Sequence, residues 1–211
     1  MSNTCNHLHN LFNSLPKHKF PFNINEIPLN GIYILFEKNE LAHNTNRIVR
    51  IGTHTGNNQL ISRLNQHFVN ENKDRSIFRK NIGRALLNKN NDSFLKSWEL
   101  DLTTKASRIL NNPIDFNKQK QVEKEVTKYI QENFSFAVFE VKNKEERLKL
   151  ESKIISTISQ CNECKPSLNW LGLFSPKEKI RNSGLWLVNE LNKEPLSEKE
   201  LFNISTFLQV P

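Results

Sequence analysis

The sequence predicts an α+β fold, in which a small central mixed or antiparallel β-sheet is flanked by α-helices. Short segments rich in β-branched and aromatic residues occur at about 31–36, 47–52 and 134–141, which is typical of strands. Around them, apolar residues recur with the spacing of helices. The hydrophobic fraction of 36% is enough to bury a core. We therefore expect the strands and helices to pack as layers of one domain of 211 residues.

The first part of the chain, residues 1–30, is expected to form a helix and a connector. Leu8, Leu11, Phe12 and Leu15 have helical spacing, and Pro16 ends that segment. The stretch 17–30 contains further prolines and is interpreted as a connector.

Two predicted strands and two predicted helices follow the connector. The strands at 31–36 and 47–52 are separated by a loop rich in Asn and in charged residues. A helix is predicted at about 58–69, which places Arg63 and His67 four residues apart on one face. A second helix is predicted at about 76–88.

The remaining elements complete the predicted domain. Residues 89–133 are polar and rich in Lys, so a helical insertion is expected at about 80–133, with a loop around Pro113. A strand at 134–141 and an amphipathic helix at 144–160 come next. The predicted core thus spans 31–172, and 173–211 form a C-terminal extension.

An ordered set of motifs lies on these elements. The first strand begins Gly31-Ile32-Tyr33, and the second ends Arg50-Ile51-Gly52. The helix after them carries an Arg-x-x-x-His pattern, and two later motifs contain Glu151, in Leu150-Glu151-Ser152-Lys153-Ile154-Ile155, and Asn169, in Ser167-Leu168-Asn169-Trp170-Leu171-Gly172. This set resembles the catalytic core of the GIY-YIG nuclease family, over about 31–69 and 134–170.

The resemblance implies a metal-dependent DNA endonuclease that hydrolyses phosphodiester bonds with one divalent cation. Glu151 would hold that cation, Mg²⁺ or Mn²⁺, which keeps most of its water ligands. Tyr33 would be the general base, although a phenol ordinarily titrates near pH 10 and needs nearby cations to serve in this way. Arg63 would bind a phosphate oxygen, His67 would contact the phosphate or the water, and Asn169 would orient Glu151 or its metal.

The second motif departs from the family pattern, because Arg50 stands where the family usually has tyrosine. Arginine stays protonated at neutral pH, so it cannot be a general base. We expect Arg50 either to stabilise a tyrosinate at Tyr33 or to bind the scissile phosphate. The alternative is that Arg50 marks a degenerate site. Members of the family with a cation here resemble restriction enzymes, so a type II restriction-like enzyme is the favoured role.

The formal charge of +8 and the pI of about 9.4 are compatible with double-stranded DNA as the partner. Two groups of basic residues are candidate DNA contacts. The first is Arg75, Arg79, Lys80 and Arg84 on the second predicted helix, and the second is Lys177 and Arg181 in the C-terminal extension. A solvated helix face is the alternative interpretation of the first group.

Three cysteines, an odd number, argue against a disulfide framework. Cys161-Asn162-Glu163-Cys164 has the spacing of zinc ligands, and Cys5, His7 and His9 could complete a tetrahedral set. Only one such pair is present and the other candidates are far away in sequence, so the favoured interpretation is that Cys161 and Cys164 are two unpaired thiols on the surface, with zinc as the alternative.

No apolar run is long enough to span a membrane, so we expect a cytoplasmic protein, with a homodimer possible. Two other classes of function compete with the nuclease. One is a catalytically inactive nucleic-acid-binding domain, for which Arg50 would be the sign of lost chemistry. The other is a structural or protein-interaction domain whose basic charge is incidental.

Overall fold

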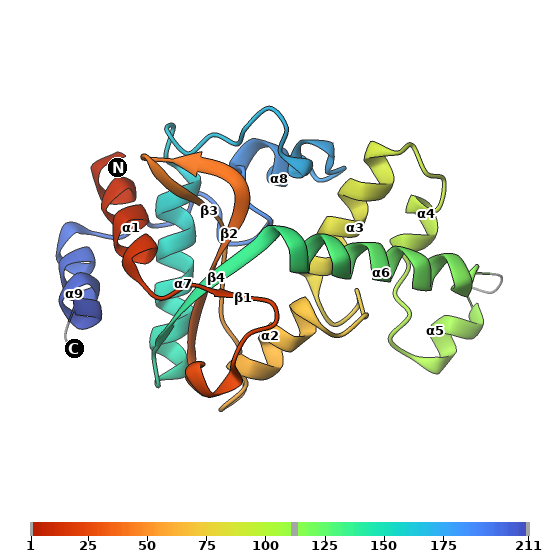
Figure 1. Ribbon diagram of the computed structural model, residues 1–211, viewed down its shortest axis with the longest axis horizontal. Helices are drawn as coiled ribbons and strands as arrows, with labels where there is room; N and C mark the ends of the chain where they lie inside the picture. The colour runs from red at the N-terminus through yellow and green to blue at the C-terminus, as the bar shows by residue number, and fades with distance from the viewer. Residues whose placement is uncertain (1, 111–113, 210–211) are drawn as a thin grey trace.

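The structure, a computed structural model, describes residues 2–110 and 114–209, and it confirms the predicted α+β fold. Its centre is a four-stranded sheet with the order β1-β4-β2-β3, in which every neighbouring pair is antiparallel (Figure 1). The strands are β1 (His18–Lys19), β2 (Gly31–Ala42), β3 (Thr45–Gly52) and β4 (Phe134–Glu140). Of the two predicted sheet types, the antiparallel one is therefore observed.

Strands β2 and β3 form one hairpin that is longer than the sequence indicated. The turn between them consists of His43 and Asn44, which have φ of 50° and 59°. Two successive positive φ values are the mark of a type I′ turn, whose twist matches that of the paired strands. The short strand β1, which pairs with β4, was not predicted, because two residues carry no alternating pattern.

Helices cover both faces of the sheet. Since side chains alternate along a strand, Ile32, Ile34 and Phe36 point to one face. There they pack with α1 (Ser2–Ser14), α7 (Lys144–Ser159) and α9 (Glu198–Gln209). Tyr33 and Leu35 point to the other face. That face is covered by α2 (Leu60–Phe68), α3 (Ile77–Lys89) and α6 (Phe116–Asn133).

The predicted insertion is helical and projects away from the sheet (Figure 1). It contains α4 (Leu95–Trp98) and α5 (Lys105–Leu110) between α3 and α6. The predicted loop around Pro113 lies outside the described residues. The C-terminal part contains η2 (Leu171–Phe174), α8 (Glu178–Ser183) and α9; a further turn, η1 (Ile24–Glu26), precedes β2. The predicted boundaries of the three parts of the domain stay a prediction.

A buried carboxylate joins the sheet, the insertion and the C-terminal part. Glu37 of β2 accepts hydrogen bonds from the hydroxyl of Tyr129 at 2.5 Å and from the indole N–H groups of Trp170 and Trp186 at 2.8 and 2.7 Å. Burial nevertheless raises the pKa of Glu37, against the effect of these three donors. Trp170 and Trp186 are buried, as expected for large aromatic residues.

A buried ion pair holds the same C-terminal part against the hairpin. Arg47 of β3 pairs with Glu40 of β2 at 2.6 Å and donates to the carbonyl oxygen of Gly184 at 2.5 Å. Gly184 has φ of 70° and ends α8. A side chain at this position would be strained and would also meet the guanidinium of Arg47, which glycine avoids. Among the described residues, no helix has both the length and the apolar composition that crossing a membrane requires.

Candidate active site

The two tripeptide motifs meet as neighbours in the sheet, where Tyr33 of β2 pairs with Gly52 of β3. The Tyr33 ring lies directly over Gly52, so that a Cβ at position 52 would be 2.1 Å from the Tyr33 hydroxyl. Gly31 is equally constrained, because a Cβ there would be 2.2 Å from the carbonyl oxygen of Phe139 in β4. Both glycines are therefore required by close approach of other groups.

The Tyr33 hydroxyl is part of a chain of polar contacts. It lies 2.8 Å from Nε2 of His67 and accepts a hydrogen bond from Nε of Arg50 at 3.4 Å. Nδ1 of His67 lies 2.7 Å from the hydroxyl of Ser76, which also caps the N-terminus of α3. Tyr33 and His67 are both 0% exposed. The structure thus brings three predicted site residues together from β2, β3 and α2.

Burial lowers the pKa of His67 well below its ordinary value, and the charges of Arg63, Arg50 and Arg79 lower it further. The imidazole is therefore neutral at neutral pH, with one N–H donor and one acceptor nitrogen. If Nδ1 donates to Ser76, Nε2 is free to accept the Tyr33 hydroxyl proton. This tautomer is assigned from the hydrogen-bond partners.

Arg50 is held in place by groups from distant parts of the chain. Besides its bond to Tyr33, it donates to the carbonyl oxygen of Trp186, and it lies over the Phe78 ring at 5.4 Å from the centroid. Its side chain is buried. This position agrees with the expectation that Arg50 acts on Tyr33, while its role in the chemistry stays a prediction.

Glu151 reaches the end of β3 from helix α7, where its Oε1 accepts the backbone N–H of Thr53 at 3.2 Å. Burial raises the pKa of this carboxyl, and repulsion by Glu190 acts in the same direction. The charges of Arg50 and Arg63 and the Thr53 amide oppose the rise. Both arginines are therefore close enough to influence Glu151 electrostatically.

Arg63 lies half-buried on α2, four residues before His67. Its guanidinium donates to the side chain of Gln66 at 3.0 Å and to the carbonyl oxygen of Arg75 at 3.1 Å. Neither partner is a charged group that would neutralise the arginine. Among its described contacts, the Arg63 guanidinium is therefore not paired with a carboxylate.

The donors around Glu151 fit a hydrated Mg²⁺ ion. Oε1 is used by Thr53, whereas the hydrogen bonds among the described residues leave Oε2 without a partner. Mg²⁺ prefers oxygen ligands and keeps several waters when it binds one or two carboxylates. Glu190, which the sequence analysis did not identify, is a second carboxylate whose charge acts on Glu151; its oxygens accept from Ser152 at 2.5 Å and from Lys193 at 2.9 Å.

The structure does not join Asn169 to the other predicted site residues. Asn169 lies in an exposed turn, two residues after Ser167, whose backbone N–H donates a hydrogen bond to Glu40 near the tip of the hairpin. The described contacts of Asn169 include none with Glu151 or Tyr33. Its assignment to the site therefore stays a prediction, without support from the geometry.

The prediction that Arg79, Lys80 and Arg84 of the 75–84 helix contact DNA is not supported by the structure, and neither is the alternative of a solvated helix face. Arg79 is fully buried and pairs with Glu123 of α6 at 2.7 Å, and Arg84 pairs with Glu99 at 2.6 Å. Lys80 is partly buried and donates to the carbonyl oxygen of Glu99 at 2.8 Å. The reason is that α3 packs against α4, α6 and η2, so most of its surface is covered. Arg75, Lys177 and Arg181 are exposed.

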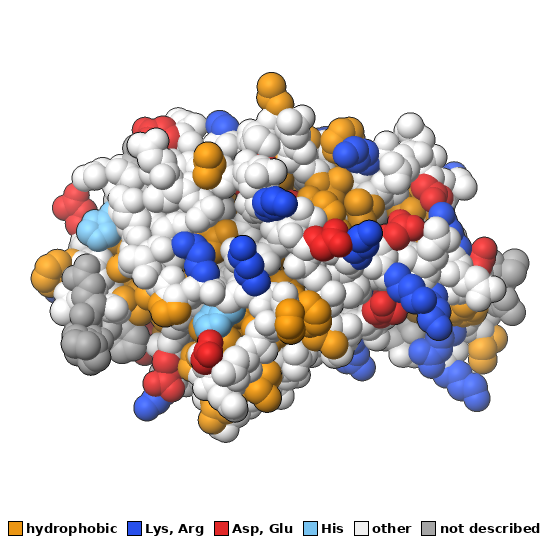
Figure 2. Space-filling view, viewed as in Figure 1, with side chains coloured by type: hydrophobic (Ala, Val, Ile, Leu, Met, Phe, Trp, Pro, Cys, Tyr) orange, Lys and Arg blue, Asp and Glu red, His pale blue; other side chains and the backbone are white. Residues whose placement is uncertain are grey.

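A different basic surface was missed by the sequence analysis. Lys120, Lys124 and Lys128 of α6 are all exposed and follow one another at intervals of four residues, which places them on one helix face. Figure 2 shows Lys and Arg side chains gathered over α5 and the nearby end of α6. The four-residue spacing could have revealed this surface in the sequence.

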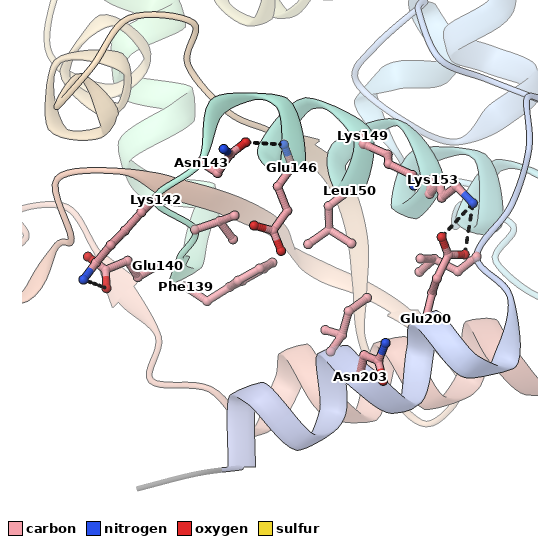
Figure 3. Close-up of a pocket in the computed structure, with 13 residues that line it drawn as sticks. Phe139, Glu140, Lys142, Asn143, Glu146, Lys149, Leu150, Lys153, Glu200 and Asn203 are labelled. Carbon is pink, nitrogen blue, oxygen red and sulfur yellow. Dashed lines mark hydrogen bonds and ion pairs between the residues drawn. The ribbon is translucent and has the colours of Figure 1, made fainter.

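A cavity of about 590 Å³ lies elsewhere, between the end of β4, α7 and α9 (Figure 3). Its wall combines apolar side chains such as Phe139 and Leu150 with the ion pair of Lys153 and Glu200. No residue of the predicted catalytic set lines it. It is therefore not the candidate active site.

The prediction that Cys161 and Cys164 are surface thiols is wrong. Both side chains are buried, as is Cys5, and all three are free cysteines. The turn that carries Cys161 and Cys164 folds back under the tip of the hairpin, since both sulfurs contact His43.

A family model described as a GIY-YIG domain matches residues 13–206 of this chain. The matched range contains both tripeptide motifs, Arg63, His67 and Glu151. Comparisons with curated proteins and with solved structures found no match.

Proposed function

Because this chain belongs to the GIY-YIG family, whose members are nucleases, we propose that it is a metal-dependent endonuclease that hydrolyses double-stranded DNA. The observation that carries the proposal is the contact chain from Arg50 through the Tyr33 hydroxyl to His67, with Arg63 and Glu151 within electrostatic reach. Water activation, phosphate binding and cation binding each have a residue in this arrangement.

Each residue is assigned one task. Tyr33 acts in its tyrosinate form, after its own proton has been released to solvent; it then takes the proton from the attacking water, and Arg50 balances the negative charge of the tyrosinate. Arg63, whose charge is not neutralised by a carboxylate, binds a phosphate oxygen. Because its pKa is lowered, His67 is neutral and does not store a proton during the reaction. We therefore propose that it positions the Tyr33 hydroxyl. Glu151 would hold Mg²⁺ or Mn²⁺, which supplies charge neutralisation at the phosphate and the leaving oxygen.

DNA is proposed to follow the exposed basic residues. These include Arg75, Lys177 and Arg181 from the original prediction, together with the Lys120, Lys124 and Lys128 face of α6. Each cation set against a phosphate releases counterions, so binding should weaken steeply as salt is added.

A type II restriction-like role, a cytoplasmic location and a homodimer are the finer parts of the proposal. The restriction role rests on the cation at position 50. A gene for a DNA methyltransferase beside this one would support it, and sedimentation with and without DNA would decide the homodimer.

One observation favours a second candidate, an inactive nucleic-acid-binding domain. Tyr33 has no exposed surface in the structure, and Arg50 covers its hydroxyl. Catalysis therefore requires Arg50 and its neighbours to move when DNA binds, whereas binding alone does not.

The decisive experiment incubates the full chain with plasmid and phage DNA, with Mg²⁺ or Mn²⁺ and with EDTA. We expect cleavage that EDTA abolishes. Glu151→Gln should reduce the cleavage rate by at least about 100-fold, since losing several kcal/mol of charge stabilisation slows a reaction by this much or more. DNA affinity should be retained.

The matched control is Glu145→Gln, which removes the same charge from the exposed first turn of the same helix. It should cleave like the wild type. DNA binding without cleavage of any substrate would favour the inactive binding domain, and cleavage that resists EDTA would contradict the metal assignment.

A further inference from the structure

A second group of reactive side chains lies at the hairpin tip, away from Tyr33 and Glu151. Cys5 comes from α1, His43 from the turn between β2 and β3, and Cys161 and Cys164 from the turn after α7. One potential ligand atom from each lies within 4.8 Å of all the others. The cluster brings together residues as far apart in sequence as 159 positions.

The distances suit four ligands around one small ion. Cys5 Sγ lies 3.3 Å from Cys164 Sγ, and Nε2 of His43 lies 3.3 and 3.5 Å from the sulfurs of Cys164 and Cys161. In a tetrahedral zinc site with Zn–S bonds of about 2.3 Å, neighbouring sulfurs are roughly 3.8 Å apart. A disulfide would need about 2.05 Å, much less than the observed separation.

The histidine is oriented as a metal-binding histidine usually is. Nδ1 of His43 lies 3.4 Å from a carboxylate oxygen of Glu163, so that Nε2 points to the sulfurs. A carboxylate on the far nitrogen fixes the tautomer and the ring orientation of a histidine that binds metal. The His43 side chain is only 3% exposed.

Of the two histidines expected from the sequence to complete a zinc set, His9 lies beside the cluster and His7 lies away from it. Nε2 of His9 accepts the backbone N–H of Ile48 at 3.3 Å and lies 3.9 Å from the sulfur of Cys164. Its Nδ1 donates to the carbonyl oxygen of Cys5 at 3.0 Å and lies 3.6 Å from the sulfur of Cys5, so both ring nitrogens already have backbone partners. Nε2 of His7 lies 3.1 Å from the hydroxyl of Ser205. His43 takes their place, and it is far in sequence from both Cys5 and the Cys161–Cys164 pair.

We propose that Cys5, His43, Cys161 and Cys164 bind one Zn²⁺ ion in a closed tetrahedral site. Three thiolates and one imidazole are ligands that Zn²⁺ prefers over the hard cations Mg²⁺ and Ca²⁺. Since all four positions are filled by protein, the site is structural: it fastens α1, the hairpin tip and the segment after α7 to one another. It is distinct from the proposed cation site at Glu151.

The test measures zinc and thiols on the full chain. Protein produced with zinc in the medium and freed of unbound metal should contain one zinc per chain by elemental mass spectrometry. Its three thiols should resist a thiol reagent under native conditions and react once a chelator is added. After exchange with Co²⁺, the visible spectrum should be that of a tetrahedral thiolate site. These measurements need no variant, so a misfolded mutant cannot obscure the result.

Variants then assign the ligands. His43→Asn removes the imidazole, while Asn tolerates the positive φ of the turn, and it should lose the zinc. His7→Asn is the matched control and should retain it. Glu163→Gln should weaken zinc binding by about 10- to 100-fold, as expected for a residue that orients a ligand. Wild-type protein without zinc, or with a disulfide between Cys5 and Cys164, would overturn the proposal, as would zinc retained by His43→Asn.

Discussion

Arg50 acts on three members of the proposed catalytic set, either by a hydrogen bond or through its charge. It donates to Tyr33, its charge lowers the pKa of His67, and it opposes the burial that raises the pKa of Glu151. Glu151 must be ionised to hold a cation. Loss of the charge at position 50 should therefore leave less of the carboxylate available as the pH falls.

We predict that Arg50→Gln moves the acidic limb of the pH–rate profile to higher pH. The sign follows because removing a nearby positive charge raises the pKa of Glu151, so protonation sets in earlier during acidification. Arg50→Lys keeps the positive charge, so the acidic limb of its pH–rate profile should lie closer to that of the wild type. Measuring kcat/KM against pH checks this, and an unmoved acidic limb in Arg50→Gln would show that Arg50 does not act on Glu151.

The close contact between Gly52 and the Tyr33 ring leads to a prediction about activity and stability. Gly52→Ala places a Cβ 2.1 Å from the Tyr33 hydroxyl. The ring must move, so we expect loss of cleavage and a loss of unfolding free energy of about 1–3 kcal/mol, as for overpacked cores. Gly56→Ala is the control: its Cβ would meet only the end of the flexible Gln59 side chain. Cleavage assays and urea unfolding of both variants test this prediction. Equal cleavage rates and equal unfolding free energies in Gly52→Ala and Gly56→Ala would refute the packing argument.

The proposed catalytic residues could be named from the sequence because each occupies a fixed place in an ordered motif. Asn169 shows the limit of that reasoning, since it satisfies the motif and yet lies in an exposed turn beside the hairpin tip. Glu190 shows the opposite failure, in which a residue near the proposed site is missed by the sequence analysis. It has no motif, and only the path of the chain after α8 brings it near Glu151.

Helices α3 and α6 show how an element can be predicted correctly and its function wrongly. The sequence located α3 to within a residue at each end and identified its basic residues. The partner that neutralises Arg79 is Glu123, 44 positions later on α6. Periodicity tells which residues share a face of one helix, but it does not tell which other element covers that face.

We predict that substitutions on α6 change the salt dependence of DNA binding but not stability, whereas a substitution on α3 changes stability but not the salt dependence. Replacing Lys120, Lys124 and Lys128 together by Gln should reduce the salt dependence of DNA binding by up to about 0.9 in log–log slope per phosphate contacted. Stability should change by less than about 0.5 kcal/mol per site, as is usual for surface substitutions. Arg79→Gln should leave the slope unchanged and cost about 3–5 kcal/mol of unfolding free energy, since it leaves Glu123 buried without its partner.

The matched control for the α6 triple replaces Lys142, Lys144 and Lys149, which are exposed near the start of α7. It removes the same net charge from another surface. Equal loss of affinity in the two triples would mean that only net charge matters, and the α6 face would lose its assignment. Fluorescence anisotropy with labelled duplex DNA at several salt concentrations measures the slopes.

At the scale of the whole molecule, Glu37 connects the sheet with the insertion and the C-terminal part. The raised pKa of its carboxyl means that the folded chain binds this proton more tightly than the unfolded chain does. Its contribution to stability is therefore largest below the unfolded pKa, about 4.3, and declines as the pH rises through the folded pKa.

We predict that the advantage of the wild type over Glu37→Gln shrinks as the pH rises through this range, by about 1.4 kcal/mol for each unit of pKa shift. Urea unfolding of both proteins at a series of pH values measures the difference. Tyr129→Phe removes one of the three donors and serves as the control for lost hydrogen bonding. A difference that grows with pH would contradict the raised pKa.

The contact between Arg50 and Trp186 has a consequence for the newly made chain. The carbonyl group that holds this arginine lies 136 positions further along the sequence. At about 5–20 residues per second, a ribosome needs on the order of ten seconds to reach it. The hairpin with both tripeptides can form long before that moment. The proposed nuclease site is thus complete only after the ribosome has passed Trp186, so the nascent hairpin alone should be inactive on DNA.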